Sequence, residues 1–135
     1  MDSRLIAALV GTFFLLLVSS CATMPTEPLA SGELRLLRIY VPQSQEIRLN
    51  FRFVVNIDFE ANGKPEIRTA CFYFSDDGPY CFKVTDVNYG SPGTIKVEIQ
   101  AKASGSLSLE SYVFYVQDAK VKPTNLVSSH IKIIP

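Results

Sequence analysis

The sequence predicts an all-β domain, built as an antiparallel β-sandwich of about seven strands. Apolar and polar residues alternate along several stretches, and turn-forming residues separate these stretches at short intervals. Beyond residue 33, no stretch places its apolar residues at helical spacing. The chain has 135 residues, the length of a single domain. Its 47% of hydrophobic residues and 19% of charged residues favour a packed core over a disordered chain.

The first two predicted strands carry the clearest pattern. Residues 34–41 form the first, and Pro42 ends it because proline lacks the amide hydrogen that a strand uses. In the second, over residues 47–59, large apolar side chains occupy every other position: Ile47, Leu49, Phe51, Phe53, Val55, Ile57 and Phe59. Arg48, Arg52 and Asp58 lie between them. We therefore expect the odd-numbered face to point into the core and the even-numbered face into solvent.

Further strands follow, each bounded by Gly, Pro, Asn, Asp or Ser. They are residues 67–74, 80–85, 95–101, 112–116 and 127–134. Alternation with one polar face favours antiparallel sheets that are solvated on one side. About seven short strands in one domain are typical of an immunoglobulin-like sandwich. A small closed barrel gives the same alternation and is the alternative.

The N-terminal segment has the pattern of an export signal. Residues 6–18 are apolar except for Gly11 and Thr12, and Arg4 supplies a positive charge before them. The run is shorter than the roughly 20 apolar residues that a membrane-spanning helix needs. Small residues follow it at positions 19 and 20, where they leave a peptidase access to the bond. Residues 1–20 are therefore expected to be a signal peptide that is removed, and an uncleaved signal anchor is the alternative.

The end of this segment, Val18-Ser19-Ser20-Cys21, resembles the lipobox of bacterial lipoproteins. In that pattern, a branched apolar residue and two small residues precede the cysteine that is acylated. The resemblance implies cleavage before Cys21, a diacylglycerol on its thiol, usually an N-acyl chain as well, and a place in the bacterial cell envelope. Several acyl chains anchor a protein stably, whereas one holds it only marginally. Because residues 22 and 23 are Ala and Thr rather than acidic, the outer membrane is favoured if the host is Gram-negative.

The mature chain divides into a tether and a domain. Residues 21–32 are expected to be the lipidated N-terminus and a flexible tether, because they contain Pro25, Pro28 and Gly32 and show no periodicity. The immunoglobulin-like domain is expected over residues 33–135.

Two cysteines remain when Cys21 carries lipid. Cys71 and Cys81 flank the turn at residues 75–79 symmetrically. If Phe74 and Gly78 face each other, the two cysteines oppose each other on neighbouring strands, with their Cα atoms about 5.5–6 Å apart. The oxidising compartment allows a disulfide to persist. We therefore predict a structural disulfide between Cys71 and Cys81.

The C-terminal part resembles a fibronectin type III or related immunoglobulin-like domain. The resemblance is carried by Leu-Glu-Ser-Tyr-Val-Phe-Tyr-Val at residues 109–116 and Pro-Thr-Asn-Leu-Val-Ser at residues 123–128. It implies that Tyr112 is a corner tyrosine, whose hydroxyl bonds back to the preceding turn. The chain has no Trp, and its cysteines are not spaced to join two sheets. The resemblance therefore implies a fold and no function.

Few residues suggest chemistry. Thirteen Lys and Arg balance 13 Asp and Glu, so no basic surface for nucleic acid is expected. Asp76, Asp77 and Asp86 lack the spacing of a calcium loop and are interpreted as turn residues. His130 is the single histidine, which is too few for a zinc site. We predict no catalytic residue, no metal site and no cofactor.

Two groups of residues remain as candidates for binding. Arg48 and Arg52, with Asn50 between them, would suit a carboxylate or a sugar, although such a row is also the ordinary solvated face of a sheet. A possible aromatic surface consists of Tyr73, Tyr80, Tyr89 and Tyr115. The sequence thus favours a membrane-anchored, non-catalytic binding or assembly module whose partner is another envelope protein or a glycan. A structural accessory subunit is the alternative, and an enzyme is least favoured.

Overall fold

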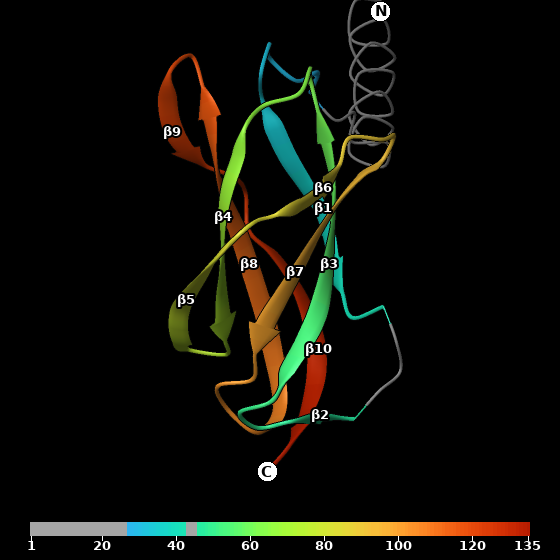
Figure 1. Cartoon of the computed structure of the whole chain (residues 1–135), viewed down its shortest axis with the longest axis vertical. Coiled ribbons are helices and arrows are strands. Elements are labelled where there is room, and N and C mark those ends of the chain that lie inside the picture. The colour runs from blue at the N-terminus through green and yellow to red at the C-terminus, as the bar shows by residue number, and fades with distance from the viewer. Residues whose placement is uncertain (1–26, 43–45) are drawn as a thin grey trace, which may run out of the picture.

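The computed structural model describes residues 27–42 and 46–135, and these residues form a β-sandwich (Figure 1). The predicted all-β class is confirmed, and two separate sheets replace the alternative of a closed barrel. The described residues contain ten strands rather than about seven, because the sequence pattern merged β2 with β3 and missed the short strands β6 and β9. In chain order the strands are β1 (Leu34–Tyr40), β2 (Ile47–Arg48), β3 (Arg52–Ala61), β4 (Ile67–Phe74), β5 (Asp77–Lys83), β6 (Asp86–Asn88), β7 (Gly93–Gln100), β8 (Gly105–Gln117), β9 (Lys120–Pro123) and β10 (Val127–Ile134).

The strand order within the sheets is immunoglobulin-like. The smaller sheet runs β1-β3-β7-β6, and the larger runs β2-β10-β8-β4-β5, with β9 pairing on β8. In an immunoglobulin-like sandwich, the first, second, fifth and fourth main strands form one sheet and the third, sixth and seventh form the other. Counted in that way, β1, β3, β7 and β6 face β4, β8 and β10. The prediction of antiparallel sheets holds for every described strand pair except β2 with β10, which is parallel.

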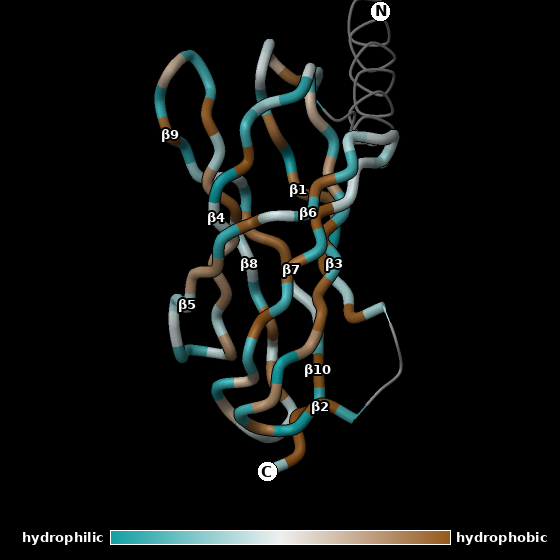
Figure 2. Tube along the Cα trace, in the orientation of Figure 1, coloured by the Kyte–Doolittle hydropathy of each residue, from teal (hydrophilic) through white to brown (hydrophobic). Residues whose placement is uncertain are grey.

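The core lies between the two sheets and consists of alternate residues from the long strands. Figure 2 shows hydrophobic and hydrophilic residues alternating along β3 and β7. Side chains that are at most 1% exposed include Val55, Ile57, Phe59, Phe72, Phe74, Ile95, Ile99, Leu109 and Val113. Burying one such side chain stabilises the fold by roughly 1.5–3 kcal/mol, so this inner layer determines the register of both sheets.

The predicted long strand at residues 47–59 is divided between the two sheets. β2 pairs with β10 in the larger sheet, and β3 pairs with β1 and β7 in the smaller one. Between them the backbone turns: Asn50 has φ 68°, and the amide of Phe51 donates to the Arg48 carbonyl at 3.1 Å. A left-handed residue interrupts an extended strand. Consequently Phe51 is 65% exposed, and the expected inward odd face is wrong at this residue, although it is confirmed for Val55, Ile57 and Phe59.

Candidate functional site

A cleft of about 770 Å³ lies where the chain leaves the smaller sheet after β1 and joins the larger sheet at β2. Its size is within the range of small-ligand and peptide sites. The end of β1, the β2–β3 segment and two residues of β7 contribute to its walls. The lining residues are Val41, Pro42, Glu46, Ile47, Arg48, Phe51, Arg52, Phe53, Val54, Asn56, Lys96 and Glu98.

The cleft contains both arginines of the predicted row, although not as one face of one strand. Arg48 lies on β2 and Arg52 begins β3, so they belong to different sheets and meet at the cleft. Asn50 lies in the turn between them and is not part of the lining. Arg48 is 3.7 Å from Glu46 and Arg52 is 3.6 Å from Glu98. All four side chains are more than half exposed, so these ion pairs stabilise the fold little and leave the guanidinium groups available to a ligand.

One buried polar side chain that lines the cleft, that of Asn56, was not predicted from the sequence. Asn56 points outward from β3, yet only 7% of it is exposed. Its Nδ2 donates weakly to the Tyr40 hydroxyl at 3.4 Å, and its Oδ1 has no hydrogen-bond partner. Lys96 is the cross-strand neighbour of Asn56 on β7, and both residues line the cleft. A buried acceptor without a partner costs about 1–3 kcal/mol.

Asp58, two residues further along β3, is also buried, but its carboxylate is satisfied. Arg38 Nε donates to it at 2.6 Å, while the hydroxyls of Thr94 and Tyr40 approach at 3.3 and 3.4 Å. The hydrogen bond to Asp58 raises the pKa of Arg38. The Arg38 guanidinium also lies 4.5 Å from the centre of the Tyr40 ring. Because these partners come from two neighbouring strands, β1 and β7, the alternating pattern of β3 alone could not predict that Asp58 would be buried.

The predicted disulfide is confirmed. Cys71 on β4 and Cys81 on β5 are bonded and face each other directly in the antiparallel register. Their Cα atoms are 4.0 Å apart, closer than the expected 5.5–6 Å and nearer to the narrow, non-hydrogen-bonded spacing of antiparallel strands. Cys71 is fully buried, so this crosslink forms part of the packed structure.

The register that brings the cysteines together differs from the expected one. Phe74 faces Asp77 rather than Gly78, and a bulge between this pair and the disulfide restores the alignment. Gly78 is required in this bulge, because its φ is 144° and a Cβ there would lie 2.7 Å from the Phe72 carbonyl oxygen. The disulfide was therefore predicted correctly, whereas the expected register of the turn is wrong by one residue.

Tyr112 is not a corner tyrosine. The inward-facing residues of β8 are odd-numbered, Ser111 and Val113 among them, so Tyr112 lies on the outer face of the larger sheet. There its ring centre lies 6.2 Å from that of Tyr73 and 5.4 Å from that of Phe114. Partial burial, followed by the proximity of Tyr73, raises the pKa of Tyr112.

The remaining tyrosines and polar candidates are dispersed. Tyr80 packs on Phe74, and Tyr89 packs on Phe59. Tyr115 is buried on the inner face of β8. The four tyrosines named as a possible aromatic surface therefore do not form one.

The three aspartates and the histidine considered in the sequence analysis do not lie together either. Asp76 lies in the β4–β5 turn, Asp77 begins β5 and accepts a hydrogen bond from Tyr80, and Asp86 begins β6. His130 is an exposed residue of β10. Within residues 27–42 and 46–135, no three His, Cys, Asp or Glu side chains are placed to hold a metal ion.

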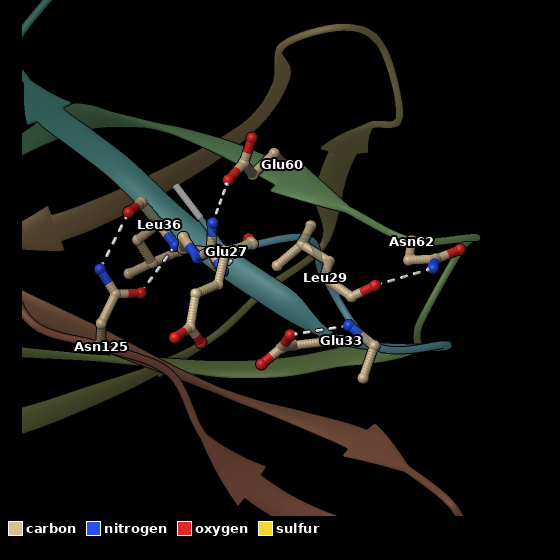
Figure 3. A network of polar contacts seen from close by, with 9 residues as sticks. Glu27, Leu29, Glu33, Leu36, Glu60, Asn62 and Asn125 are labelled. Atoms are coloured by element: carbon tan, nitrogen blue, oxygen red, sulfur yellow. Dashed lines mark hydrogen bonds and ion pairs between the residues drawn. The ribbon is translucent and has the colours of Figure 1, made fainter. Parts of the chain in front are cut away.

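The segment that precedes β1 is fastened to the domain (Figure 3). Arg35 donates to the Glu27 carbonyl at 2.9 Å, Asn62 Nδ2 donates to the Leu29 carbonyl at 3.1 Å, and Figure 3 shows both regions side by side. Outside the figure, Gln117 Nε2 donates to the Ser31 carbonyl at 3.0 Å. The part of the expected tether that the structure describes, residues 27–32, thus follows the surface of the sandwich.

The predicted lipidation site, Cys21, lies outside the described residues, as does the rest of residues 1–26. In the described part of the chain, no helix is long and apolar enough to cross a membrane. A comparison of the whole chain with protein-family models and with curated proteins gives no match.

Proposed function

We propose that this chain is a lipoprotein of the bacterial cell envelope, anchored through lipid on Cys21, and that its β-sandwich is a non-catalytic binding or assembly module. Its partner is another envelope protein or a glycan, and in a Gram-negative host the anchor is in the outer membrane. The observation that carries this proposal is the apolar run at residues 6–18 that ends in Val18-Ser19-Ser20-Cys21.

The attachment of residues 27–33 to the sandwich supports a defined orientation of the domain relative to the membrane. The Gly32 amide donates to the Asn62 carbonyl at 2.9 Å, and the Asn62 amide donates to the Glu33 carbonyl at 3.0 Å. These bonds fix the path of the chain as it enters the sandwich. Only five residues, 22–26, separate that segment from Cys21, and fully extended they span at most about 16–18 Å. The upper end of the sandwich in Figure 1 would therefore lie close to the membrane.

The cleft suits a module that binds rather than reacts. It lies towards the opposite end of the molecule, around β2 and the first residues of β3 (Figure 1), where an anchored domain would present it away from the lipid. Its described lining combines apolar, cationic and acidic side chains and contains no serine, cysteine or histidine. Such a mixture of apolar and charged side chains is typical of surfaces that recognise a partner.

The test is to replace the acylated thiol. Cys21→Ser should abolish incorporation of radiolabelled palmitate and release the protein from the membrane fraction or leave its leader uncut. The matched control is the double variant Cys71→Ser, Cys81→Ser, which should still be labelled because its lipobox is intact. Continued labelling of the Cys21→Ser protein would show that the lipobox interpretation is wrong.

A further inference from the structure

The β8–β9 hairpin lies beside the segment through which the chain enters the sandwich. Gln117, where β8 ends, donates from Nε2 to the Ser31 carbonyl at 3.0 Å, and a Cβ on Gly32 would lie 3.6 Å from its Cγ. On the other side, Asn62 of the β3–β4 loop donates to the Leu29 carbonyl at 3.1 Å. The hairpin, the loop and the entry segment therefore form one end of the molecule, the upper end in Figure 1.

The length of chain that precedes this end limits how far it can lie from an anchor on Cys21. Residues 22–26 separate Cys21 from Glu27, and fully extended they span at most about 16–18 Å. A surface held by so short a link meets the membrane at an effective concentration of about a millimolar or more. A contact that is too weak to recruit a free protein therefore suffices to orient this anchored one.

The hairpin carries an exposed apolar residue close to its tip. Val121 is 52% exposed and pairs with Val116 on the outer face of the larger sheet. Ala119, in the turn, is also exposed and is two residues away, about 7 Å along an extended chain. Interfacial contacts reach about 5–10 Å into the boundary between headgroups and acyl chains. Val121 therefore reaches this boundary when the turn lies in the headgroup layer.

The exposed charges of this end have both signs. Lys64 in the β3–β4 loop and Lys120 in the hairpin are exposed, and within residues 27–42 and 46–135 neither forms an ion pair with an acidic side chain. Glu27 and Asp118 are exposed acidic residues of the same end. A mixed surface of this kind complements zwitterionic headgroups, which offer a phosphate to each lysine and an ammonium to each carboxylate.

We propose that the β8–β9 hairpin is a second, non-covalent contact of the anchored domain with the bilayer. Its turn enters the headgroup layer of the membrane that holds the lipid on Cys21, with Val121 at the acyl boundary and Lys64 and Lys120 at the phosphates. A tether alone leaves a domain free to rotate, whereas two points of contact hold it upright. The inference rests on the anchor proposed above and adds the surface that faces the lipid.

The experiment uses single tryptophans, because the chain has none of its own. The acylated mature chain with Val121→Trp is placed in vesicles of phosphatidylethanolamine and phosphatidylglycerol, some of which carry brominated acyl chains as a quencher. Its emission should move to shorter wavelength and be quenched by bromine. Phe51→Trp is the matched probe: Phe51 is 65% exposed and lies at the other end of the sandwich, so this variant should show neither change.

A charge placed in the turn should undo the contact. Ala119→Asp in the Val121→Trp background should abolish the wavelength shift and the quenching, because it brings a carboxylate into the headgroup layer. Ala119 has φ 61°, a conformation that Asp adopts more readily than most residues, so the hairpin keeps its shape. Leu126→Asp adds the same charge at a residue that is 52% exposed outside the hairpin and should leave both signals unchanged. Circular dichroism of each variant reports whether the fold is retained.

Two results would overturn the proposal: equal responses of the Val121→Trp and Phe51→Trp proteins, or equal effects of Ala119→Asp and Leu126→Asp. The mass of the purified chain tests the anchor separately, since a chain without acyl groups on Cys21 refutes the anchor and not the hairpin contact. In that case the Cys21 thiol is coupled to a maleimide lipid in the same vesicles, and the same comparison of tryptophan variants decides on the hairpin.

Discussion

Phe59 shows how tightly a single side chain is packed in the core. It is 1% exposed, its ring meets that of Tyr89 edge-on at 5.8 Å, and it fills the space above Gly93 so closely that a Cβ there would lie 2.3 Å from the ring. Arg52, on the same strand, has a side chain that is 78% exposed. The same strand thus carries a fully packed side chain and a largely exposed one.

Phe59→Ala should lower the free energy of unfolding by about 3–5 kcal/mol, because it removes a buried aromatic ring and leaves a cavity. Arg52→Ala should cost less than about 0.5 kcal/mol. Urea unfolding of the mature chain with Cys21→Ser measures both values. Similar losses for the two variants would contradict the assignment of the faces of β3.

The faces of β3 were predictable only in part. The alternation in the sequence correctly assigns Val55, Ile57 and Phe59 to the core. It fails at Phe51, because the turn depends on the left-handed backbone of Asn50, and the Leu-Asn-Phe sequence there contains no Gly or Pro to announce it. It also misses Asn56, whose burial depends on neighbouring strands.

At the scale of elements, the β4–β5 hairpin is held by its crosslink as well as by its backbone pairing. The disulfide closes a loop across residues that are ten apart in sequence. Replacing both cysteines by alanine should cost roughly 2.5–3 kcal/mol on the chain-entropy model, which attributes the effect to the less restricted unfolded chain.

The measurement compares urea midpoints of the wild-type cysteine pair with those of the Cys71→Ala, Cys81→Ala double variant, both in the Cys21→Ser background. Under reducing conditions the difference between the two proteins should largely disappear. Mass analysis after alkylation without reduction provides the control. Two alkyl groups on Cys71 and Cys81 of the native protein would contradict the disulfide.

Elements were predicted well where alternation and turn residues agree. β4 and β10 have the bounds expected from the sequence, because each combines a regular pattern with Pro, Ser or Asp at its ends. β2 was absorbed into a longer predicted strand, and β6 and β9 were missed. The β8–β9 turn uses positive φ angles at Asp118 and Ala119, and alanine gives no sign of such a conformation.

At the scale of the whole molecule, Asn125 links the two sheets. It lies between β9 and β10 of the larger sheet, and its side chain acts as a strand partner for Leu36 in β1 of the smaller sheet (Figure 3). It accepts a hydrogen bond from the Leu36 amide at 2.8 Å and donates one to the Leu36 carbonyl at 2.9 Å.

Asn125→Ala should lower the free energy of unfolding by about 1–3 kcal/mol, because it leaves both backbone groups of Leu36 without partners in a partly buried place. Leu126→Ala is the neighbouring control and should cost less than about 0.5 kcal/mol, since Leu126 is 52% exposed. Chemical unfolding measures both. If the two losses are equal, the amide does not close the sandwich.

The antiparallel pairing of β1 with β3 has a mechanical consequence. Residues 27–33 lead into the start of β1, and the start of β3 lies at the other end of the same antiparallel pair. A pull between these two points would therefore act along the strands, in opposite directions on β1 and β3. Hydrogen bonds loaded in this shearing direction share the force and break together, while bonds peeled from one end break one after another. The pairing of β1 with β3 would thus resist a pull along the length of the sandwich.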